Sequence, residues 1–153
     1  MVVIQDSISI SGRWYTFRTP EWLTSERFPL LNRVVAGRGE CPEGYTNGQA
    51  HAHDRGEYRG CICFQLKREW SKVETSSVPT AMFLHEYAHL QTNRTHGKRW
   101  QAAYAALLDE WGYLAEYGDA PLGKPSALVG VADFRFWKYS NAPGGLIFHR
   151  EVE

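Results

Sequence analysis

The sequence lacks the features that mark several large classes of protein. It has no uninterrupted apolar run near the roughly 18 to 20 residues that a membrane-spanning helix needs. Residues 1–10 hold no basic segment followed by an apolar stretch, so no secretory signal is predicted. There is no low-complexity tract and no repeat with a period of about 20 to 50 residues, which disfavours a solenoid. We therefore expect a cytoplasmic protein with no membrane partner.

Cysteine and net charge are scarce as well. Cys41, Cys61 and Cys63 permit at most one internal disulfide, too few to frame a small secreted scaffold. The 17 Lys and Arg residues balance 17 Asp and Glu residues, whereas nonspecific DNA binding needs a basic surface. DNA is thus conceivable as a partner but not indicated by the charge. A modest basic rim is an alternative to the favoured interpretation of a solvated face, and its residues would be Lys67, Arg68, Lys72, Arg94, Lys98 and Arg99.

The composition indicates one folded domain. The chain has 153 residues, of which 43% are apolar and 22% charged, close to the averages of globular proteins. We therefore expect a single domain over residues 1–153. Alternation of apolar and polar residues predicts strands over 2–10, 13–19 and 61–66, with Ser11-Gly12 as a turn between the first two.

Apolar residues at helical spacing predict three helices. The first covers residues 21–35, the second covers 80–92 after a start signal at Ser76-Ser77-Val78-Pro79, and the third ends near Gly118. The third carries its apolar stripe on Trp100, Ala103, Tyr104, Leu107, Leu108, Trp111 and Leu114. Residues 36–60 are predicted to form a long loop, and the alternation in 132–151 suggests a C-terminal hairpin.

The middle of the second helix holds His85-Glu86-Tyr87-Ala88-His89. Residues four apart on an α-helix stand one turn apart on the same face, so both imidazoles can reach one ion. Zinc suits two imidazole nitrogens and a third protein ligand, with a fourth position for water. Glu86 lies near the same side, where its carboxylate can take a proton from that water. The spacing therefore predicts a zinc site with Glu86 as general base.

The third zinc ligand has two candidates. His96 follows the motif after a polar turn, and helical extrapolation places it on the apolar side of the third helix. Glu110 is the rival, because a glutamate from the following helix is another common solution. His96 is favoured because it lies close to the motif in the sequence, and Glu110 stays open as the alternative.

These residues resemble a known family. The motif of His85, Glu86 and His89, followed by His96-Gly97-Lys98-Arg99-Trp100, is similar to the SprT-like zinc metallopeptidases and their WLM- and YgjP-type relatives. The resemblance extends over residues 59–111, and residues 119–153 match nothing in it. The C-terminal Cys-x-x-Cys pair of many SprT-like proteins is missing, and the spacing between His89 and His96 is closer to the YgjP type. The resemblance implies an α+β fold with a minimal zincin-like core: a small mixed or antiparallel sheet packed on two to three helices, including the motif helix.

The resemblance also implies an activity. It places zinc on His85, His89 and His96, and it implies hydrolysis of peptide bonds in protein substrates by a zinc-activated water, with Glu86 as general base. It further implies that the strand over 61–66 offers a free edge to an extended peptide, so that the candidate substrate-binding residues are Cys61, Ile62, Cys63 and Phe64. The oxyanion needs a second stabiliser besides the metal, for which the candidates are Tyr104, Arg99 and His149.

Two other functions are considered. The chain could be a non-catalytic, zinc-stabilised module that binds peptide or DNA, or a metal-dependent hydrolase of a non-peptide substrate. The intact Glu86 argues against a pure binding module, which needs no base beside its metal. A second, structural zinc site could assemble from Cys41, His51, His53, Cys61 and Cys63. Their spacing matches no compact zinc module, so thiols and surface histidines without metal are the favoured interpretation. No oligomeric state or physiological substrate is predicted.

Overall fold

A computed structural model of the chain describes residues 5–7, 15–18, 20–37, 50–65, 75–78, 80–117, 120–129, 138–140 and 146–150. Their elements are, in order, β1 (Gln5–Ser7), β2 (Tyr15–Arg18), β3 (Arg33–Gly37), β4 (Ala50–Ala52), β5 (Cys61–Gln65), β6 (Thr75–Val78), α1 (Thr80–Gln91), α2 (Lys98–Glu110), β7 (Leu114–Tyr117), β8 (Ala120–Gly123), the 3-10 helix η2 (Pro125–Leu128), β9 (Lys138–Ser140) and β10 (Leu146–Arg150). Helices and strands are segregated along the chain, so the fold is α+β, as predicted. Neither described helix is long and apolar enough to cross a membrane.

The largest sheet is small and mixed, with the strand order β1-β3-β5-β4. β1, β3 and β5 run parallel to one another, and β4 pairs antiparallel with β5. Val34, Ile62 and Ala52 stand side by side in its register and are all buried in the core. Since side chains alternate across a strand, this row marks one face of the sheet as the core face.

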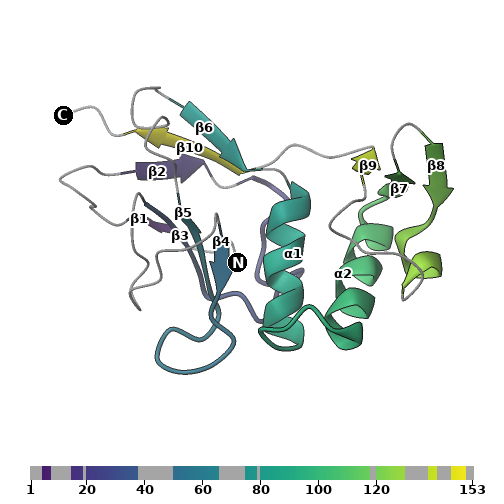
Figure 1. The fold of residues 1–153 in the computed structure, drawn as a ribbon. Helices are drawn as coiled ribbons and strands as arrows, with labels where there is room; N and C mark the ends of the chain where they lie inside the picture. Colours follow the sequence, from purple (N-terminus) through teal and green to yellow (C-terminus); the bar gives the residue numbers. More distant parts are fainter. Residues whose placement is uncertain are drawn as a thin grey trace.

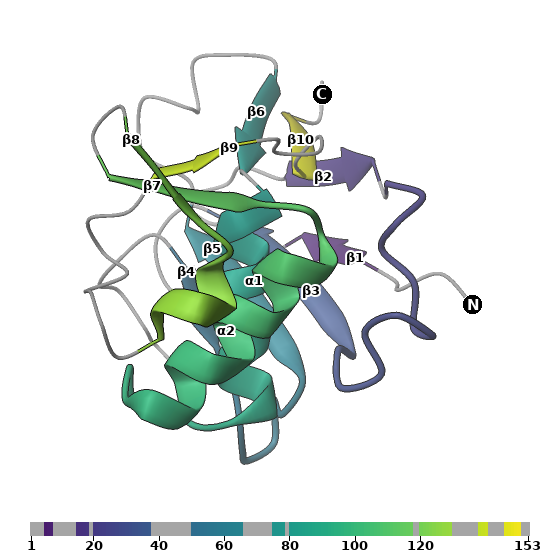
Figure 2. The same ribbon diagram turned by 90° about the vertical axis from the view of Figure 1, so that its right-hand side faces the viewer.

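Helix α1 lies between this sheet and α2, as the two perpendicular views show (Figures 1 and 2). A helix covered on both sides needs apolar residues around most of its circumference. Accordingly α1 buries Phe83, Leu84, Tyr87 and Ala88, while α2 buries its predicted stripe at Trp100, Tyr104, Leu107 and Leu108. The motif helix is therefore held rigidly at the centre of the molecule.

Helix α2 ends earlier than predicted, at Glu110 rather than near Gly118. Gly112 adopts φ +75°, a conformation that favours glycine. The Gly112 N–H donates to the Asp109 carbonyl at 3.0 Å, and the Tyr113 N–H donates to the Leu108 carbonyl at 3.0 Å. These are the two hydrogen bonds of a Schellman motif. The chain then turns into β7, so the end of the apolar stripe belongs to a strand.

The predicted helix over 21–35 is wrong. Residues 21–30 form successive turns, and β3 follows them. Pro29 lacks an N–H to donate and disfavours helical backbone at Phe28 before it. Leu23, Phe28 and Leu31 are nevertheless buried, so their apolar pattern reports burial within irregular turns.

Other boundaries changed as well. The expected Ser cap before α1 is strand β6, and the predicted loop over 36–60 contains the end of β3 and all of β4. The strands over 13–19 and 61–66 are confirmed as β2 and β5, and that over 2–10 in its described part, β1. β1 pairs with β3, and β2 with β10, so the first two strands are not partners; Ser11-Gly12 lies outside the described residues.

The remaining strands form two three-stranded sheets, β2-β10-β6 and β8-β7-β9. β9 pairs with β7, whereas β10 pairs with β2 and β6. The described strands of the expected hairpin over 132–151 thus belong to different sheets. The rest of that segment lies outside the described residues.

Candidate metal centre

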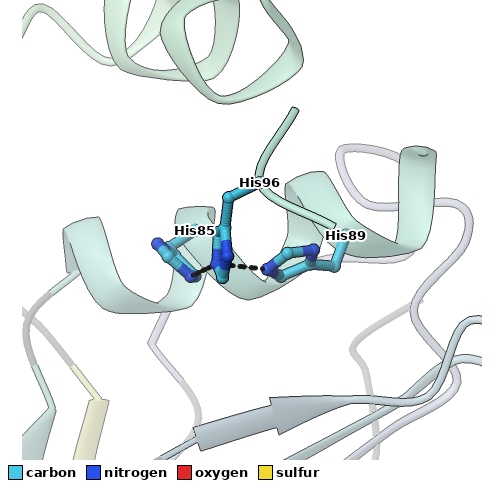
Figure 3. Close-up of side chains that lie close together, drawn as sticks. All are labelled: His85, His89 and His96. Atoms are coloured by element: carbon cyan, nitrogen blue, oxygen red, sulfur yellow. Dashed lines mark hydrogen bonds between the residues drawn. The ribbon is translucent and has the colours of Figure 1, made fainter. Parts of the chain in front are cut away.

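Three histidines converge beside the C-terminal half of α1 (Figure 3). His85 and His89 lie one helical turn apart with ring centroids 5.1 Å apart, and the turn after α1 brings His96 against both. The Nε2 atom of His96 lies 3.1 Å from Nε2 of His89 and 3.2 Å from Nε2 of His85. Within the described ranges, this trio is the one group of three His, Cys, Asp or Glu residues whose ligand atoms all lie within 4.8 Å of one another.

The rival third ligand is elsewhere. Glu110 is exposed at the end of α2, where its carboxylate lies 3.9 Å from Arg27 Nε. The preference for His96 over Glu110 is confirmed in so far as the structure brings His96, and not Glu110, to the other two histidines.

The spacing of the three nitrogens suits a bound ion. Two imidazole nitrogens that bind one ion tetrahedrally at about 2.0–2.1 Å lie about 3.3 Å apart. The two observed separations are within about 0.2 Å of that value. The ligand atoms of all three histidines lie within 4.8 Å of one another, so the trio could hold a metal ion.

The positions of the protons on the imidazole rings also favour a bound cation. His89 Nδ1 lies 2.7 Å from the backbone carbonyl of Asn93, which can only accept, so Nδ1 carries the proton and Nε2 presents a lone pair. One N–H on His96 Nε2 cannot serve both neighbours with good geometry. A cation would satisfy all three lone pairs at once. A ring N–H donated to a backbone carbonyl is also the usual arrangement behind a metal-ligating histidine.

The turn that carries His96 is fixed by its own hydrogen bonds. Asn93 Oδ1 accepts from the Thr95 N–H at 2.9 Å and from the Thr95 hydroxyl at 2.6 Å. Thr92 Oγ1 donates to the Ala88 carbonyl at 2.8 Å. Asn93 therefore contributes twice, through its carbonyl to His89 and through its side chain to the turn. The sequence predicts only a polar turn here, although asparagine often orders turns in this way.

Trp100 supports the trio from α2. Its indole N–H donates to the His85 carbonyl at 3.1 Å, and its ring stacks on His89 with centroids 5.3 Å apart. The rings of His85 and His96 each lie 4.6 Å from it in edge-on contact. The apolar pattern identified Trp100 as a core residue, and the structure adds that it orients all three imidazoles.

Burial sets the protonation of the site. Burial, with the adjacent rings of His89 and His96, lowers the pKa of His85 to about 3. Burial also lowers the pKa of His89 and raises the pKa of Glu86 to about 8. The lowered pKa values of His85 and His89 keep these two imidazoles neutral at pH 7, the form that binds metal. A cation beside Glu86 would favour its carboxylate form.

Glu86 and the three histidines line one pocket. The Glu86 side chain is buried, with Oε1 3.8 Å from His85 Nε2. The opposite wall is β4 and Arg94, whose Nε donates to Asp54 Oδ1 at 2.9 Å. The full lining is Ala50, His51, Ala52, His85, Glu86, His89, Arg94 and His96.

The strand with a free edge was misidentified. β5 is paired on both sides, with β3 and β4, so the peptide-binding edge expected over Cys61, Ile62, Cys63 and Phe64 does not exist there. Ile62 and Phe64 belong to the core instead. Within the described residues the edge strands of this sheet are β1 and β4, and β4 borders the pocket. β4 has only three residues and lies within a glycine-rich stretch, so its alternation of side chains is too short to predict a strand from the sequence.

The oxyanion candidates do not line the pocket in the described part of the chain. Tyr104 is buried and stacks on Trp100, and Arg99 is exposed on α2. His149 lies on β10 in another sheet, and its side chain is outside the described residues. Of the expected basic rim, Arg94, Lys98 and Arg99 are exposed, and the others lie outside the described residues.

No protein-family model, curated protein or solved structure matches the chain. The function is therefore argued from the geometry of the site.

Proposed function

We propose that the chain is a zinc-dependent hydrolase of peptide bonds, with a zincin-like core and with Glu86 as its general base. The observation that carries the proposal is the shared pocket of three convergent imidazoles and one buried carboxylate. A purely structural zinc site has four protein ligands and no open position. Within the described residues this site offers three histidines, which leaves one position of a tetrahedral ion open toward the pocket.

The donor set fits zinc, which binds neutral imidazoles in tetrahedral sites. When bound, zinc would polarise a substrate carbonyl and acidify a water molecule at its open position. Glu86 accepts a proton at its carboxylate, and the low exposure of that carboxylate keeps competing water away. Glu86 then delivers the same proton to the leaving amine, so the residue ends the cycle as it began.

β4 supplies a means of binding an extended substrate. Among the described strands β4 pairs only with β5, so its other edge can add a peptide strand by backbone hydrogen bonding. Because β4 lines the pocket beside His85 and Glu86, a peptide added there runs past the open metal position. Backbone recognition of this kind favours unfolded or extended protein segments over folded ones.

The test compares two Glu→Gln variants. Glu86→Gln should lower hydrolysis of unfolded casein by on the order of 10²–10⁴-fold while one zinc ion per chain stays bound at the histidines. Glu110→Gln is the matched control, since Glu110 is exposed and away from the pocket, and it should keep wild-type activity. If Glu86→Gln cleaves casein as fast as the wild type, the proposed role of Glu86 is wrong.

Further arms separate the other functions. Casein cleavage that a chelator abolishes, with or without single-stranded DNA, supports the peptidase. Tight binding of casein or DNA with no cleavage by the zinc-loaded wild type would instead indicate a binding module. Chelator-sensitive cleavage of the DNA itself, with casein left intact, would indicate a hydrolase of a non-peptide substrate.

A further inference from the structure

A second cluster of metal-binding residue types lies on the other face of the large sheet. Ala52 and Ile62 mark the core face, so the alternate positions of β4 and β5 point the opposite way. His51 is the register partner of Cys63 there. His53 follows in the same row as Cys61, to whose carbonyl its N–H donates at 2.9 Å. Two histidines thus stand beside two cysteines across an antiparallel pair.

Side-chain contacts already join three of the four. His53 Nε2 lies 3.4 Å from Cys63 Sγ, and the rings of His51 and His53 meet edge-on with centroids 4.6 Å apart. Tetrahedral zinc, with bonds of about 2.3 Å to sulfur and 2.0–2.1 Å to nitrogen, places these two kinds of ligand about 3.5 Å apart. The pair of His53 and Cys63 therefore has the separation of two zinc ligands.

The surroundings suit a structural ion. His53 is fully buried, Cys61 and Cys63 are each 6% exposed, and neither cysteine forms a disulfide. The two histidines lie two residues apart, in β4 and directly after it, and the two cysteines lie two residues apart on β5, so each pair shares one face. Rotation of a side chain between staggered χ1 positions moves its donor atom without moving the backbone. Such rotations of His51 and Cys61, away from their present contacts, are required to bring a third and a fourth ligand to the contact of His53 with Cys63.

We propose that His51, His53, Cys61 and Cys63 form a second zinc site, of the structural Cys2His2 type, that fastens β4 to β5. Both thiols lose their protons to solvent when the ion binds. The site is independent of the proposed hydrolysis, since it uses none of the residues His85, Glu86, His89 and His96. Its consequence is mechanical: the ion clamps a three-residue edge strand that forms one wall of the first pocket.

Cobalt distinguishes the two sites, because only the second contains thiolates. The wild-type chain loaded with cobalt should bind about two ions and show a thiolate-to-cobalt charge-transfer band. Cys63→Ser should lose that band and one ion, whereas His96→Ala should keep the band and lose the other ion. Cys41→Ser, the same substitution at the third cysteine, should leave the spectrum unchanged.

Outcomes that overturn the site are equally specific. A wild-type chain that binds about one ion per chain without a thiolate band refutes it, and so does loss of the band in Cys41→Ser. Where Cys63→Ser fails to fold, alkylation of the wild type decides. Zinc should protect two of the three thiols at least tenfold, and equal alkylation rates with and without zinc overturn the proposal. None of these readouts depends on peptidase activity.

Discussion

Asn93 is expected to control metal affinity without touching the metal. Its side chain accepts the two hydrogen bonds from Thr95 that shape the turn before His96, and its carbonyl orients His89. Asn93→Ala removes the two side-chain bonds and leaves every ligand atom in place. The variant therefore tests whether the turn positions the third histidine or merely connects two helices.

The expected magnitude follows from the two bonds. A hydrogen bond of this kind contributes about 0.5–1.5 kcal/mol, and the exposure of Thr95 lets water replace part of it, so about 1–2 kcal/mol is lost. If that energy holds His96 in place for the ion, the dissociation constant for zinc rises by about 5- to 30-fold. Competition with a chromophoric chelator measures this change directly.

Asn32→Ala is the matched control. Asn32 donates one side-chain bond to the Arg59 carbonyl at 2.8 Å, is exposed on the surface, and does not line the pocket. It should lower the unfolding midpoint with zinc affinity within about twofold of the wild type. Should Asn93→Ala also retain wild-type zinc affinity while its unfolding midpoint falls, the turn has no positioning role and the reasoning fails.

Five further substitutions test the supports of the site and the core. Trp100→Phe loses the indole hydrogen bond to the His85 carbonyl and should weaken zinc binding about tenfold in the same competition assay. Trp111→Phe is its control, because the buried Nε1 of Trp111 has no hydrogen-bond partner among the described residues, and it should leave zinc binding unchanged. Gly60→Ala should destabilise the fold by about 2–5 kcal/mol in urea unfolding, because Gly60 adopts φ +88° and an added Cβ would clash with a neighbouring loop. Gly112→Ala, at φ +75° in open space, should cost only about 1–2 kcal/mol. Phe83→Ala, at a position with no exposure, should cost about 3–5 kcal/mol in the same assay.

The parts of the site that the sequence predicted are local in the chain. His85 and His89 share a face because of helical periodicity alone, and α1 needed only the correct assignment of helix. His96 was within reach because seven residues separate it from His89. The position of Trp100 on the apolar stripe of α2 followed from the same periodicity. None of these inferences required knowledge of how distant segments pair.

Of the two main errors, one concerns contacts between distant segments and the other concerns the local backbone around Pro29. Which strand lies at the edge depends on the pairing of β5 with both β3 and β4, and no residue of β5 signals whether its second edge is covered. Leu23, Phe28 and Leu31 are spaced almost as on a helix, yet they fill the core from turns because Pro29 breaks the backbone pattern. Periodicity therefore reported which side chains are buried more faithfully than which backbone presents them.

The three histidines of the candidate metal centre are held by different means, and this difference bears on how they would bind an ion. His85 and His89 belong to a helix packed on both sides, so the hydrophobic core fixes two ligands whether or not an ion is present. His96 lies on an exposed turn and depends on hydrogen bonds within residues 92–95 and on the ring of Trp100. Because two donors are already fixed, binding an ion would cost little conformational entropy of the chain. The third donor can adjust its distance to the ion. The proposed general base needs no such adjustment, because Glu86 is next to His85 on the same packed helix, and the core fixes its position.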